Sequence, residues 1–383
     1  DIVNALPVLS ALRAHWPNAW IAWVVNRNLR ELLEGHPELD EVIPFDRAGG
    51  AFGLRGGFAA LGLMASLRKR RFDLAIDLQG LLRSGIMTAA TGARVRAGRG
   101  DAREGAWLFY THRMPRPEPD DHAVDRLLPI ARAFGANVDP PRFVLAVSEA
   151  DRHWAREQLA AFGSPRLVLN MGARWPTKRW PPEHFAVIAR RALARYGVSL
   201  VVVGAPEDRP TVDRFRELAP ELCFLDLCGR TRLPQLAAIL AEADLVVSND
   251  TGPLHIATAA GARVVGIYTC TSPELNGPYG PRAIAVRTGV WCAASYLSRC
   301  NRLDCMTELE PERVWQAVKQ QMEQGGWFSP PLEGVVLSAS STSPPPHDGA
   351  GLSTNSSSPP HRGRANPTPL VGEGRVGGSP EPQ

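Results

Sequence analysis

The sequence of 383 residues lacks any apolar run of about 18 residues, the length at which a helix crosses a bilayer. It also lacks a basic opening segment followed by an apolar core, the pattern of a secretory signal peptide. Its six cysteines are spread thinly along the chain, which is typical of reduced thiols rather than of a disulfide framework. These absences favour a cytoplasmic protein without a membrane-spanning helix.

The sequence also lacks a strong excess of one sign of charge, because 43 Lys and Arg nearly balance 39 Asp and Glu and leave a net charge of +4. That excess is too small to indicate nucleic acid as a partner. It is compatible with an anionic membrane surface or with phosphorylated substrates.

Nucleotide and metal fingerprints are missing as well. The sequence contains no P-loop, and no G-x-G-x-x-G follows a strand-like segment. Cys292, Cys300 and Cys305 invite comparison with a zinc site, but they lack a C-x₂-C pair and no fourth ligand is evident. We expect structural thiols and no metal at these positions.

What the sequence does contain is an alternation of helical and strand-like segments. In the first half, helical spacing covers about 2–15, 29–34 and 58–69, and strand-like runs cover 20–25, 41–45 and 72–80. In the second half, strands are expected near 166–172, 198–208, 223–227, 245–248 and 264–268, and helices at 181–197, 209–219, 233–242 and 310–324. Such alternation predicts parallel sheets with helices on both faces.

Breaks in this pattern predict the domain organisation. The periodicity stops at "DPPRFVLAVSEAD" near 140–150, so we expect α/β domains at 1–145 and 146–328. Residues 329–383 are rich in Pro, Gly and Ser and contain no aromatic residue, which predicts a disordered tail. An equal alternative for the tail is translated non-coding sequence beyond the true end of the gene.

The segment "SNDTGPLH" lies between a buried strand and a helix, where open α/β sheets bind ligands. Thr251 can cap the helix, Gly252 allows close approach of a ligand, and the first-turn N–H groups form an anion site. His255 adds a donor, while Asp250 suits sugar hydroxyls or the orientation of a nearby cation. An ordinary helix start explains each residue alone, but the combination favours a phosphate-bearing ligand.

A second loop, "NMGARWPTKRWPPEHF", carries positive charge to the same sheet edge. Lys178 and Arg179, with Arg174 nearby, are able to neutralise a diphosphate leaving group as its charge develops. The alternative is a solvated basic loop. Trp175 and Trp180 are expected to pack this loop rather than to stack on a base.

Weaker signals come from further loops. Glu207 or Asp208 in "GAPED" can accept hydrogen bonds from ribose hydroxyls, and Thr231 stands just ahead of a helix. Gln79 and Arg83 in "DLQGLLRSG" are available to an acceptor. Plain turns are the alternative in each case.

Two features of the first half complete the candidates. Asp1 heads a helical segment, so it is either an N-cap or, if a strand and a Gly-containing turn precede it, a general base facing an interdomain cleft. The basic run "RKRR" at 68–71, with the stretch 94–103, is suited to anionic lipid headgroups or forms a solvated face.

Five of these segments together resemble glycosyltransferase family 9, the ADP-heptose:lipopolysaccharide heptosyltransferases. The resemblance covers about 1–325 and is most specific in "DTGPLHIATAAGARVVGIYTCTSPELNGPYGP". It extends to "DIVNALPVLSALRAHWPNAWIAWVV", "DLAIDLQGLLRSG", "WPTKRWPPEHF" and "CNRLDCMTELEPERVWQAV". The resemblance implies an α/β GT-B fold, in which two Rossmann-like doubly wound domains face a cleft. The C-terminal domain would hold most of the nucleotide sugar.

The family pattern also implies roles for individual residues. Asp1 matches the general base and Lys178 the cation for the donor phosphates. The remaining donor residues are Thr251, Gly252 and His255 at the diphosphate, Asp250 at the sugar, Arg174 nearby, and Thr231, Glu207 and Asp208 near the nucleoside. Family members carry a strand and a Gly-containing turn before the matching Asp, and we expect these to precede Asp1.

The resemblance further implies inverting, metal-independent transfer without a cofactor. The donor would be ADP-heptose and the acceptor Kdo-lipid A or a heptosylated inner core. The enzyme would be peripheral at the inner face of the inner membrane. Three rival hypotheses remain: a relative that uses another nucleotide sugar, a truncated non-catalytic nucleotide-binding remnant, and an unrelated Rossmann-like oxidoreductase.

Overall fold

The computed structural model describes residues 2–46 and 54–328. Asp1, the segment 47–53 and residues 329–383 lie outside the described residues. The expectations for Asp1 and for the tail therefore stay predictions. No helix in the described ranges combines the length and apolar character that a membrane crossing requires.

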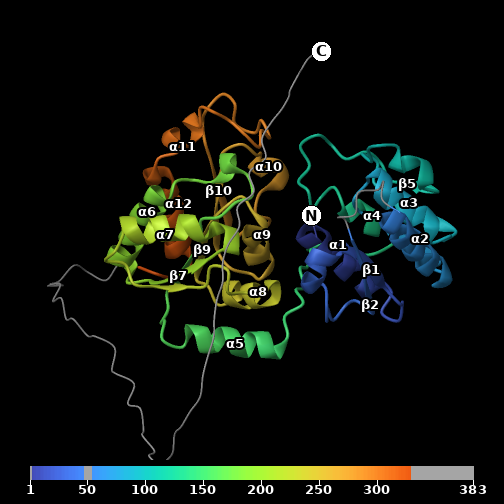
Figure 1. Ribbon diagram of the computed structural model, residues 1–383, viewed down its shortest axis with the longest axis horizontal. Helices are drawn as coiled ribbons and strands as arrows, with labels where there is room; N and C mark the ends of the chain where they lie inside the picture. Colours follow the sequence, from blue (N-terminus) through green and yellow to red (C-terminus); the bar gives the residue numbers. More distant parts are fainter. Residues whose placement is uncertain (1, 47–53, 329–383) are drawn as a thin grey trace, which may run out of the picture. The chain divides into compact units, whose positions relative to one another are not determined.

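The first half contains helices and short parallel strands in alternation (Figure 1). The elements are α1 (Ile2–His15), β1 (Ala22–Asn26), η1 (Arg27–Leu32), β2 (Glu41–Phe45), α2 (Leu54–Lys69), β3 (Leu74–Asp77), α3 (Leu82–Ala90), β4 (Val95–Gly98), η2 (Ala106–Phe109), β5 (His112–Arg113) and α4 (Leu128–Ala133). Parallel pairing confirms the expectation from alternation. The described strands nevertheless form two sheets, β1-β2 and β3-β4-β5, rather than one.

The second half repeats the alternation with longer strands. Its elements are α5 (Glu149–Leu159), β6 (Arg166–Asn170), η3 (Pro176–Lys178), α6 (Pro182–Tyr196), β7 (Ser199–Val203), η4 (Pro206–Asp208), α7 (Arg209–Leu218), β8 (Phe224–Asp226), α8 (Leu233–Ala241), β9 (Leu245–Asn249), α9 (Gly252–Ala259), β10 (Val264–Tyr268), α10 (Pro273–Asn276), β11 (Ala283–Arg287), α11 (Asp304–Glu308) and α12 (Pro311–Gln324). Two predicted helix ends are confirmed: Gly197 ends α6 with a φ of 63°, and Pro311 occupies the first turn of α12.

One parallel sheet organises this half, with the strand order β11-β10-β9-β6-β7-β8. Numbered from β6, this is the order 6-5-4-1-2-3 of a doubly wound nucleotide-binding fold. Strands β7 and β8 are added on one side of β6, and β9, β10 and β11 on the other, so the strand order reverses between the neighbours β6 and β9. In open α/β sheets, ligands bind outside the carboxyl ends of the strands at such a switch point.

Alternate side chains of the strands enter two separate cores. Leu167 and Leu169 of β6 pack in the same cluster as Phe185 of α6, whereas Val168 packs in the cluster that holds Ile239 of α8. Successive side chains of a strand point to opposite faces, so each face acquires its own helical layer. The result is a rigid sheet whose carboxyl edge can hold loops in place.

Helix α1 shares the second of these cores. Val3 and Leu6 belong to the same cluster of buried residues as Leu254 and Ala257 of α9. A second set of contacts joins segment 122–125 to segment 275–279: Ala123 N–H donates to Leu275 O (2.8 Å), and the Tyr279 hydroxyl donates to Asp125 Oδ1 (2.7 Å). These contacts link the first half to the loops that surround α9.

Candidate functional site

Polar residues meet at the switch point between β6 and β9. Asn170 ends β6 and lies opposite Ser248 in the parallel register. Its Nδ2 donates to Ser248 Oγ (2.8 Å) and to Thr251 Oγ1 (2.9 Å). Asn170 thereby holds the loop that leads from β9 into α9.

Asp250 stands at the centre of a charged cluster. Its carboxylate is buried, with 5% of the residue exposed, and its Oδ2 accepts hydrogen bonds from Lys178 Nζ (2.6 Å) and Thr271 Oγ1 (2.6 Å). His255 Nε2 lies 3.7 Å from Asp250 Oδ1, which is an ion-pair distance rather than a hydrogen bond. The structure therefore brings together three residues predicted from separate motifs, Lys178, Asp250 and His255.

The pKa of Asp250 reflects this environment. Burial of the carboxyl would by itself raise its pKa, but His255, the Lys178 ammonium and the Thr271 hydroxyl outweigh burial and lower the pKa to about 2. Asp250 is therefore ionised at neutral pH and can hold the ammonium of Lys178. Of the two roles left open for Asp250, the structure shows the geometry of the second, the orientation of a cation. Contact with a sugar stays a prediction.

The loop that carries Lys178 is anchored by tryptophan. Trp180 is fully buried; its Nε1 donates to Leu309 O (2.7 Å) and its backbone N–H to Asn249 Oδ1 (3.2 Å). Lys178 Nζ lies 4.9 Å from the ring centre of Trp175. The expected packing role fits Trp180, which fixes the loop, whereas Trp175 contacts the cation.

The amino end of α9 is open toward solvent. A Cβ added at Gly252 would meet no atom within 4 Å. In the described part of the chain, no acceptor engages the Gly252 N–H. An unpaired N–H at the positive end of a helix dipole favours an anion.

The expected capping role of Thr251 needs correction. Thr251 occupies the N-cap position, but its side chain makes no hydrogen bond to the first turn of α9. Its hydroxyl instead accepts from Asn170 Nδ2. Asn170 of the neighbouring strand β6 therefore binds the Thr251 side chain in place of α9, and the first-turn N–H groups stay available to a ligand.

The other cations of the loop lie apart from Asp250. Arg179 Nε donates to Ala173 O (2.7 Å), so Arg179 helps to fold the loop. Arg174 is exposed and forms no ion pair with a described residue. Of the three basic residues, only Lys178 contacts the acidic centre, and a donor role for Arg174 stays a prediction.

The two loops expected near a nucleoside do lie side by side. Gly229 N–H donates to Gly204 O (2.8 Å), which joins the loops after β7 and β8. Asp208 Oδ2 accepts from Ala205 N–H (2.9 Å), so this carboxylate shapes its own turn. Glu207 is exposed and Thr231 half-buried. Contact of these residues with ribose stays a prediction.

Gln79 and Arg83 follow β3, and both are exposed. The loop beneath them depends on Asp77, whose Oδ1 accepts from the N–H groups of Gln79 and Gly80 (both 2.9 Å). Tyr110 donates to the other oxygen of Asp77 (2.7 Å). Asp77 thus presents the loop, and an acceptor role for Gln79 and Arg83 stays a prediction.

Sequence reasoning overlooked Asn170 and Thr271. Both residues follow or end a buried apolar strand, as Asp250 does, so the same positional signal was available for them. What the sequence did not reveal is which strands are neighbours. Only the order β10-β9-β6 places Thr271, Asp250 and Asn170 in one cluster.

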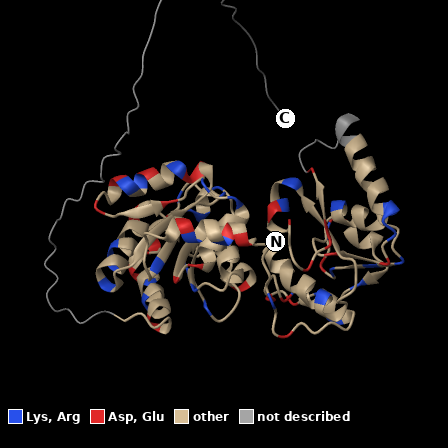
Figure 2. Ribbon diagram, turned by 90° about the horizontal axis from the view of Figure 1, so that it is seen from below, with Lys and Arg blue, Asp and Glu red and all other residues tan. Residues whose placement is uncertain are grey.

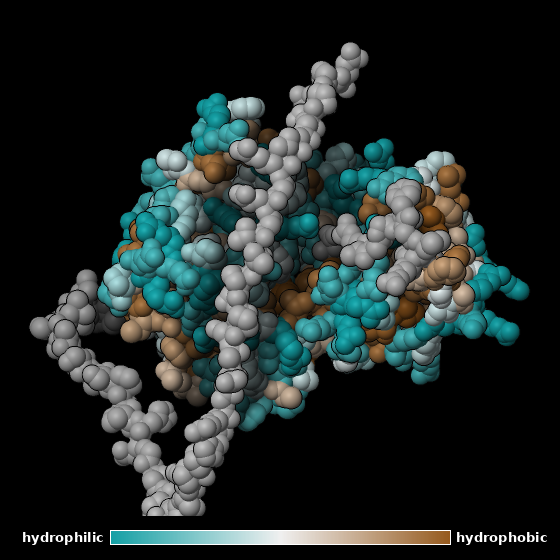
Figure 3. Space-filling model, in the orientation of Figure 1, coloured by the Kyte–Doolittle hydropathy of each residue, from teal (hydrophilic) through white to brown (hydrophobic). Residues whose placement is uncertain are grey.

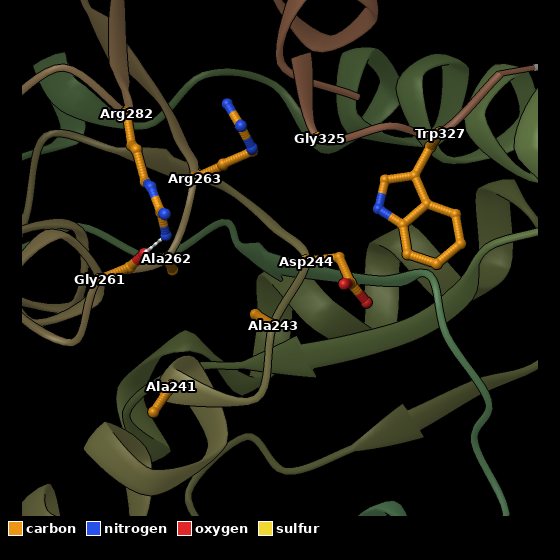
Figure 4. Close-up of a pocket in the computed structure, with 9 residues that line it drawn as sticks. All are labelled: Ala241, Ala243, Asp244, Gly261, Ala262, Arg263, Arg282, Gly325 and Trp327. Carbon is orange, nitrogen blue, oxygen red and sulfur yellow. Dashed lines mark hydrogen bonds between the residues drawn. The ribbon is translucent and has the colours of Figure 1, made fainter. Parts of the chain in front are cut away.

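A cavity of about 200 Å³ lies elsewhere, at the amino ends of β9, β10 and β11 (Figure 4). Its lining includes Asp244, Arg263, Arg282 and Trp327. Arg282 donates to Gly261 O (3.1 Å) and Arg263 Nη2 to Gln324 O (2.6 Å), so both guanidinium groups already serve the fold. Within the described residues, the polar side chains of this cavity therefore hold the fold together, in contrast to the Asp250 site at the opposite edge of the sheet. Across the described ranges, no group of three or more His, Cys, Asp or Glu is arranged to hold a metal ion.

Comparison with known proteins gives a consistent result. The model of glycosyltransferase family 9 (heptosyltransferase) matches residues 60–306. Lipopolysaccharide heptosyltransferase 1 of Pseudomonas aeruginosa is 30% identical over 82% of this chain and 92% of its own length. The lipopolysaccharide core heptosyltransferase OpsX of Haemophilus influenzae is 29% identical over 73% of this chain and 78% of its own.

Among solved structures, the ADP-heptose LPS heptosyltransferase II of E. coli aligns with a TM-score of 0.67 and 22% identity. The alignment covers 85% of this chain and 96% of that one. This likeness confirms the predicted GT-B fold of the α/β class.

Proposed function

Because the chain belongs to glycosyltransferase family 9, the heptosyltransferases, we propose that it transfers a heptose from ADP-heptose to the inner core of lipopolysaccharide. The acceptor would be Kdo-lipid A or an already heptosylated core at the membrane surface. The reaction would invert the anomeric carbon and proceed without a metal ion. The named relatives act on lipopolysaccharide, which supports this class of acceptor.

The observation that carries the proposal is the pair of Lys178 and Asp250 beside the open amino end of α9. Departure of ADP leaves negative charge on the diphosphate, and that charge requires a prearranged positive environment. Lys178, His255 and the free N–H of Gly252 supply it. Asp250 keeps the ammonium of Lys178 in one position before the donor arrives.

The proposed reaction is a single displacement. The acceptor hydroxyl oxygen forms a bond to the anomeric carbon while the bond from that carbon to the β-phosphate oxygen breaks. The proton of the hydroxyl passes to a general base, and ADP keeps the electron pair of the broken bond. Water has to be excluded, because hydrolysis of the donor competes with transfer.

Asp1 is the proposed general base. Support comes from the helix that begins at the next residue, because Val3 and Leu6 of α1 pack in one cluster with Leu254 of α9. The amino end of α9 is the proposed diphosphate site. A carboxylate ahead of α1 would therefore be available to an acceptor hydroxyl near the donor.

The remaining assignments belong to the same proposal. Thr251 would line the diphosphate site, and Arg174 would add positive charge near it. The loops with Thr231, Glu207 and Asp208 would hold the nucleoside, and Gln79 and Arg83 would face the acceptor. Residues 1–145 would then form the acceptor domain and 146–328 the donor domain.

The test compares ligands and then turnover. ADP-heptose, a UDP-sugar and NAD are offered to the purified protein, and the melting temperature is recorded. ADP release is then followed with Kdo-lipid A as acceptor. Stabilisation by ADP-heptose with acceptor-dependent release is the expected result. Preference for a UDP-sugar would identify a different donor, and binding without release would identify a non-catalytic relative.

A further inference from the structure

Helix α2 exposes an apolar surface to solvent. Residues 58–66 read "FAALGLMAS" and contain no charged side chain. Phe58 is 72% exposed and Leu61 64% exposed. A helix on the surface of a protein normally turns charged residues outward. An outward apolar face of this kind marks an interaction site.

Elements in contact with α2 also expose apolar side chains. Helix α3 contacts both α2 and η2, and it exposes Leu82, while η2 exposes Trp107 and Leu108. We call Phe58, Leu61, Leu82, Trp107 and Leu108 the apolar face. Figure 3 shows hydrophobic residues gathered on this part of the molecule.

Positive charge is concentrated in the same part of the sequence. Residues 54–116 contain twelve Lys and Arg against four Asp and Glu, a net charge of +8, although the whole chain carries only +4. The rest of the chain is therefore net negative. Figure 2 marks the positions of Lys and Arg along the ribbon in blue.

The cations next to the apolar face are free to meet a partner. Arg68 and Lys69 end α2, Arg71 follows them, and Arg83 and Arg103 belong to α3 and to the loop before η2. All five are exposed, and none forms an ion pair with a described residue. Arg70, by contrast, is paired with Glu41. Exposed apolar side chains and unpaired basic side chains thus occur together on α2, α3, η2 and the segments next to them.

We infer that the apolar face and its basic border dock on an anionic lipid bilayer. The apolar side chains would enter the interface between headgroups and acyl chains, while the Arg and Lys side chains would stay among the anionic headgroups. Binding to nucleic acid would account for the cations but not for the exposure of Phe58 and Leu61. The inference rests on the proposed function, in which the acceptor lies at the membrane surface, and adds which residues of the chain make the contact. It does not depend on the identity of the donor.

The first experiment is co-sedimentation of the full chain with vesicles. Vesicles of phosphatidylcholine alone are compared with vesicles that also contain phosphatidylglycerol. Binding is expected only to the anionic vesicles, and it is expected to weaken at high ionic strength because salt screens the headgroup charge. Equal binding to both vesicle types, or no binding at all, would overturn the inference.

A matched pair of variants locates the contact. Phe58→Gln with Lys69→Gln removes one apolar and one basic side chain from the surface and is expected to weaken vesicle binding by about tenfold or more. Trp291→Gln with Arg299→Gln likewise removes one aromatic and one basic side chain at exposed residues of the other half and should leave binding unchanged. Equal losses in both variants would contradict the assignment. All four residues are exposed, so the melting temperatures should match that of the wild type.

Two further measurements separate the remaining outcomes. Sedimentation velocity without vesicles tests whether a second copy of the chain covers the face; a dimer that the Phe58→Gln, Lys69→Gln variant abolishes would assign the face to self-association instead. ADP release with a deacylated, water-soluble acceptor should be equal in this variant and the wild type. Failure of docking and failure of the transfer reaction are thereby distinguished.

Discussion

At the scale of single residues, Gly252 and Gly172 differ in the space that an added side chain would meet. An added Cβ at Gly252 meets open space, whereas at Gly172 it would lie 2.0 Å from Asp208 Oδ2. Gly252→Ala is expected to leave the free energy of unfolding unchanged or to raise it by up to about 1 kcal/mol, since Gly252 begins a helix. ADP affinity should nevertheless fall, which isothermal titration calorimetry can measure.

Gly172→Ala is expected to lower stability, in contrast to Gly252→Ala. The new methyl group has to displace the Asp208 carboxylate from its bond to Ala205 N–H, so a loss of about 1–3 kcal/mol of stability is expected in urea unfolding. Unchanged ADP affinity in Gly252→Ala would show that no ligand approaches the amino end of α9.

Asp250→Asn tests the orientation of Lys178. The amide keeps the size of the side chain but removes the charge that holds the ammonium. We expect the rate of ADP release to fall by about 100-fold or more, because stabilisation of the leaving group depends on prearranged charge. ADP binding should not weaken, since a negative charge near the diphosphate is lost. A parallel fall in binding and turnover would instead indicate that Asp250 serves only the fold of the site.

The chemistry of the site was more predictable from sequence than its geometry. Lys178, Asp250 and His255 were found because polar residues that follow buried strands meet at one edge of a parallel sheet. Thr271 was missed, and Thr251 was expected to bond to α9 rather than to Asn170. Both differences depend on which strand lies beside which, and residue spacing does not encode that neighbour order.

At the scale of elements, the positions of helices and strands were predictable where the apolar pattern extended over a long segment. Strands β6, β7, β9 and β10 are buried on both faces and were all expected. The short segment 29–34 was expected to be an α-helix, but the structure has a 3₁₀ helix at Arg27–Leu32. Asn26 accepts from Asn28 N–H there and tightens the first turn, a local contact that periodicity does not detect.

The contact between segments 122–125 and 275–279 predicts a pH dependence of stability. His122 Nδ1 accepts from Val124 N–H (3.2 Å), so Nε2 carries the proton that is donated to Gly277 O (3.0 Å). Burial lowers the pKa of His122 below its usual value, despite the opposing effects of Gly277 and Asp125. The neutral ring is the form that the fold accepts.

Because the folded-state pKa lies below the unfolded value of about 6.5, the stabilisation is present above that pH, and it is lost as the pH falls from there through the folded-state pKa. Urea unfolding of the wild type should therefore lose more stability between neutral and mildly acidic pH than unfolding of His122→Gln. His112→Gln, a change at an exposed residue, serves as the control. Identical pH profiles of wild type and His122→Gln would contradict this role.

At the scale of the whole molecule, composition predicts that residues 329–383 add no cooperative structure. A chain that ends at Phe328 is expected to keep the melting temperature and the ADP affinity of the full chain. Differential scanning calorimetry checks the first expectation and titration with ADP the second. A lower melting temperature of the shortened chain would show that the tail contributes to the fold.

The overall charge of the chain conceals its distribution. The near balance of +4 gave little reason to expect a strongly basic surface, yet a single stretch of the first half carries +8. Composition averages over the chain, whereas docking depends on which side chains share a face. The sequence indicated the basic residues of this surface at 68–71 and 94–103, but not its apolar residues, because the exposure of Phe58 and Leu61 follows from tertiary packing.

The contact of Lys178 with Trp175 makes the fluorescence of Trp175 a reporter of the position of the Lys178 ammonium. Indole emission responds to a charge at the distance of 4.9 Å that separates the ammonium from the ring. If a bound diphosphate draws the ammonium away, the emission of Trp175 will change in step with donor capture. Trp180 is fully buried, so its fluorescence is expected to stay constant. The arrival and departure of nucleotide could then be timed in a stopped-flow fluorimeter without any label.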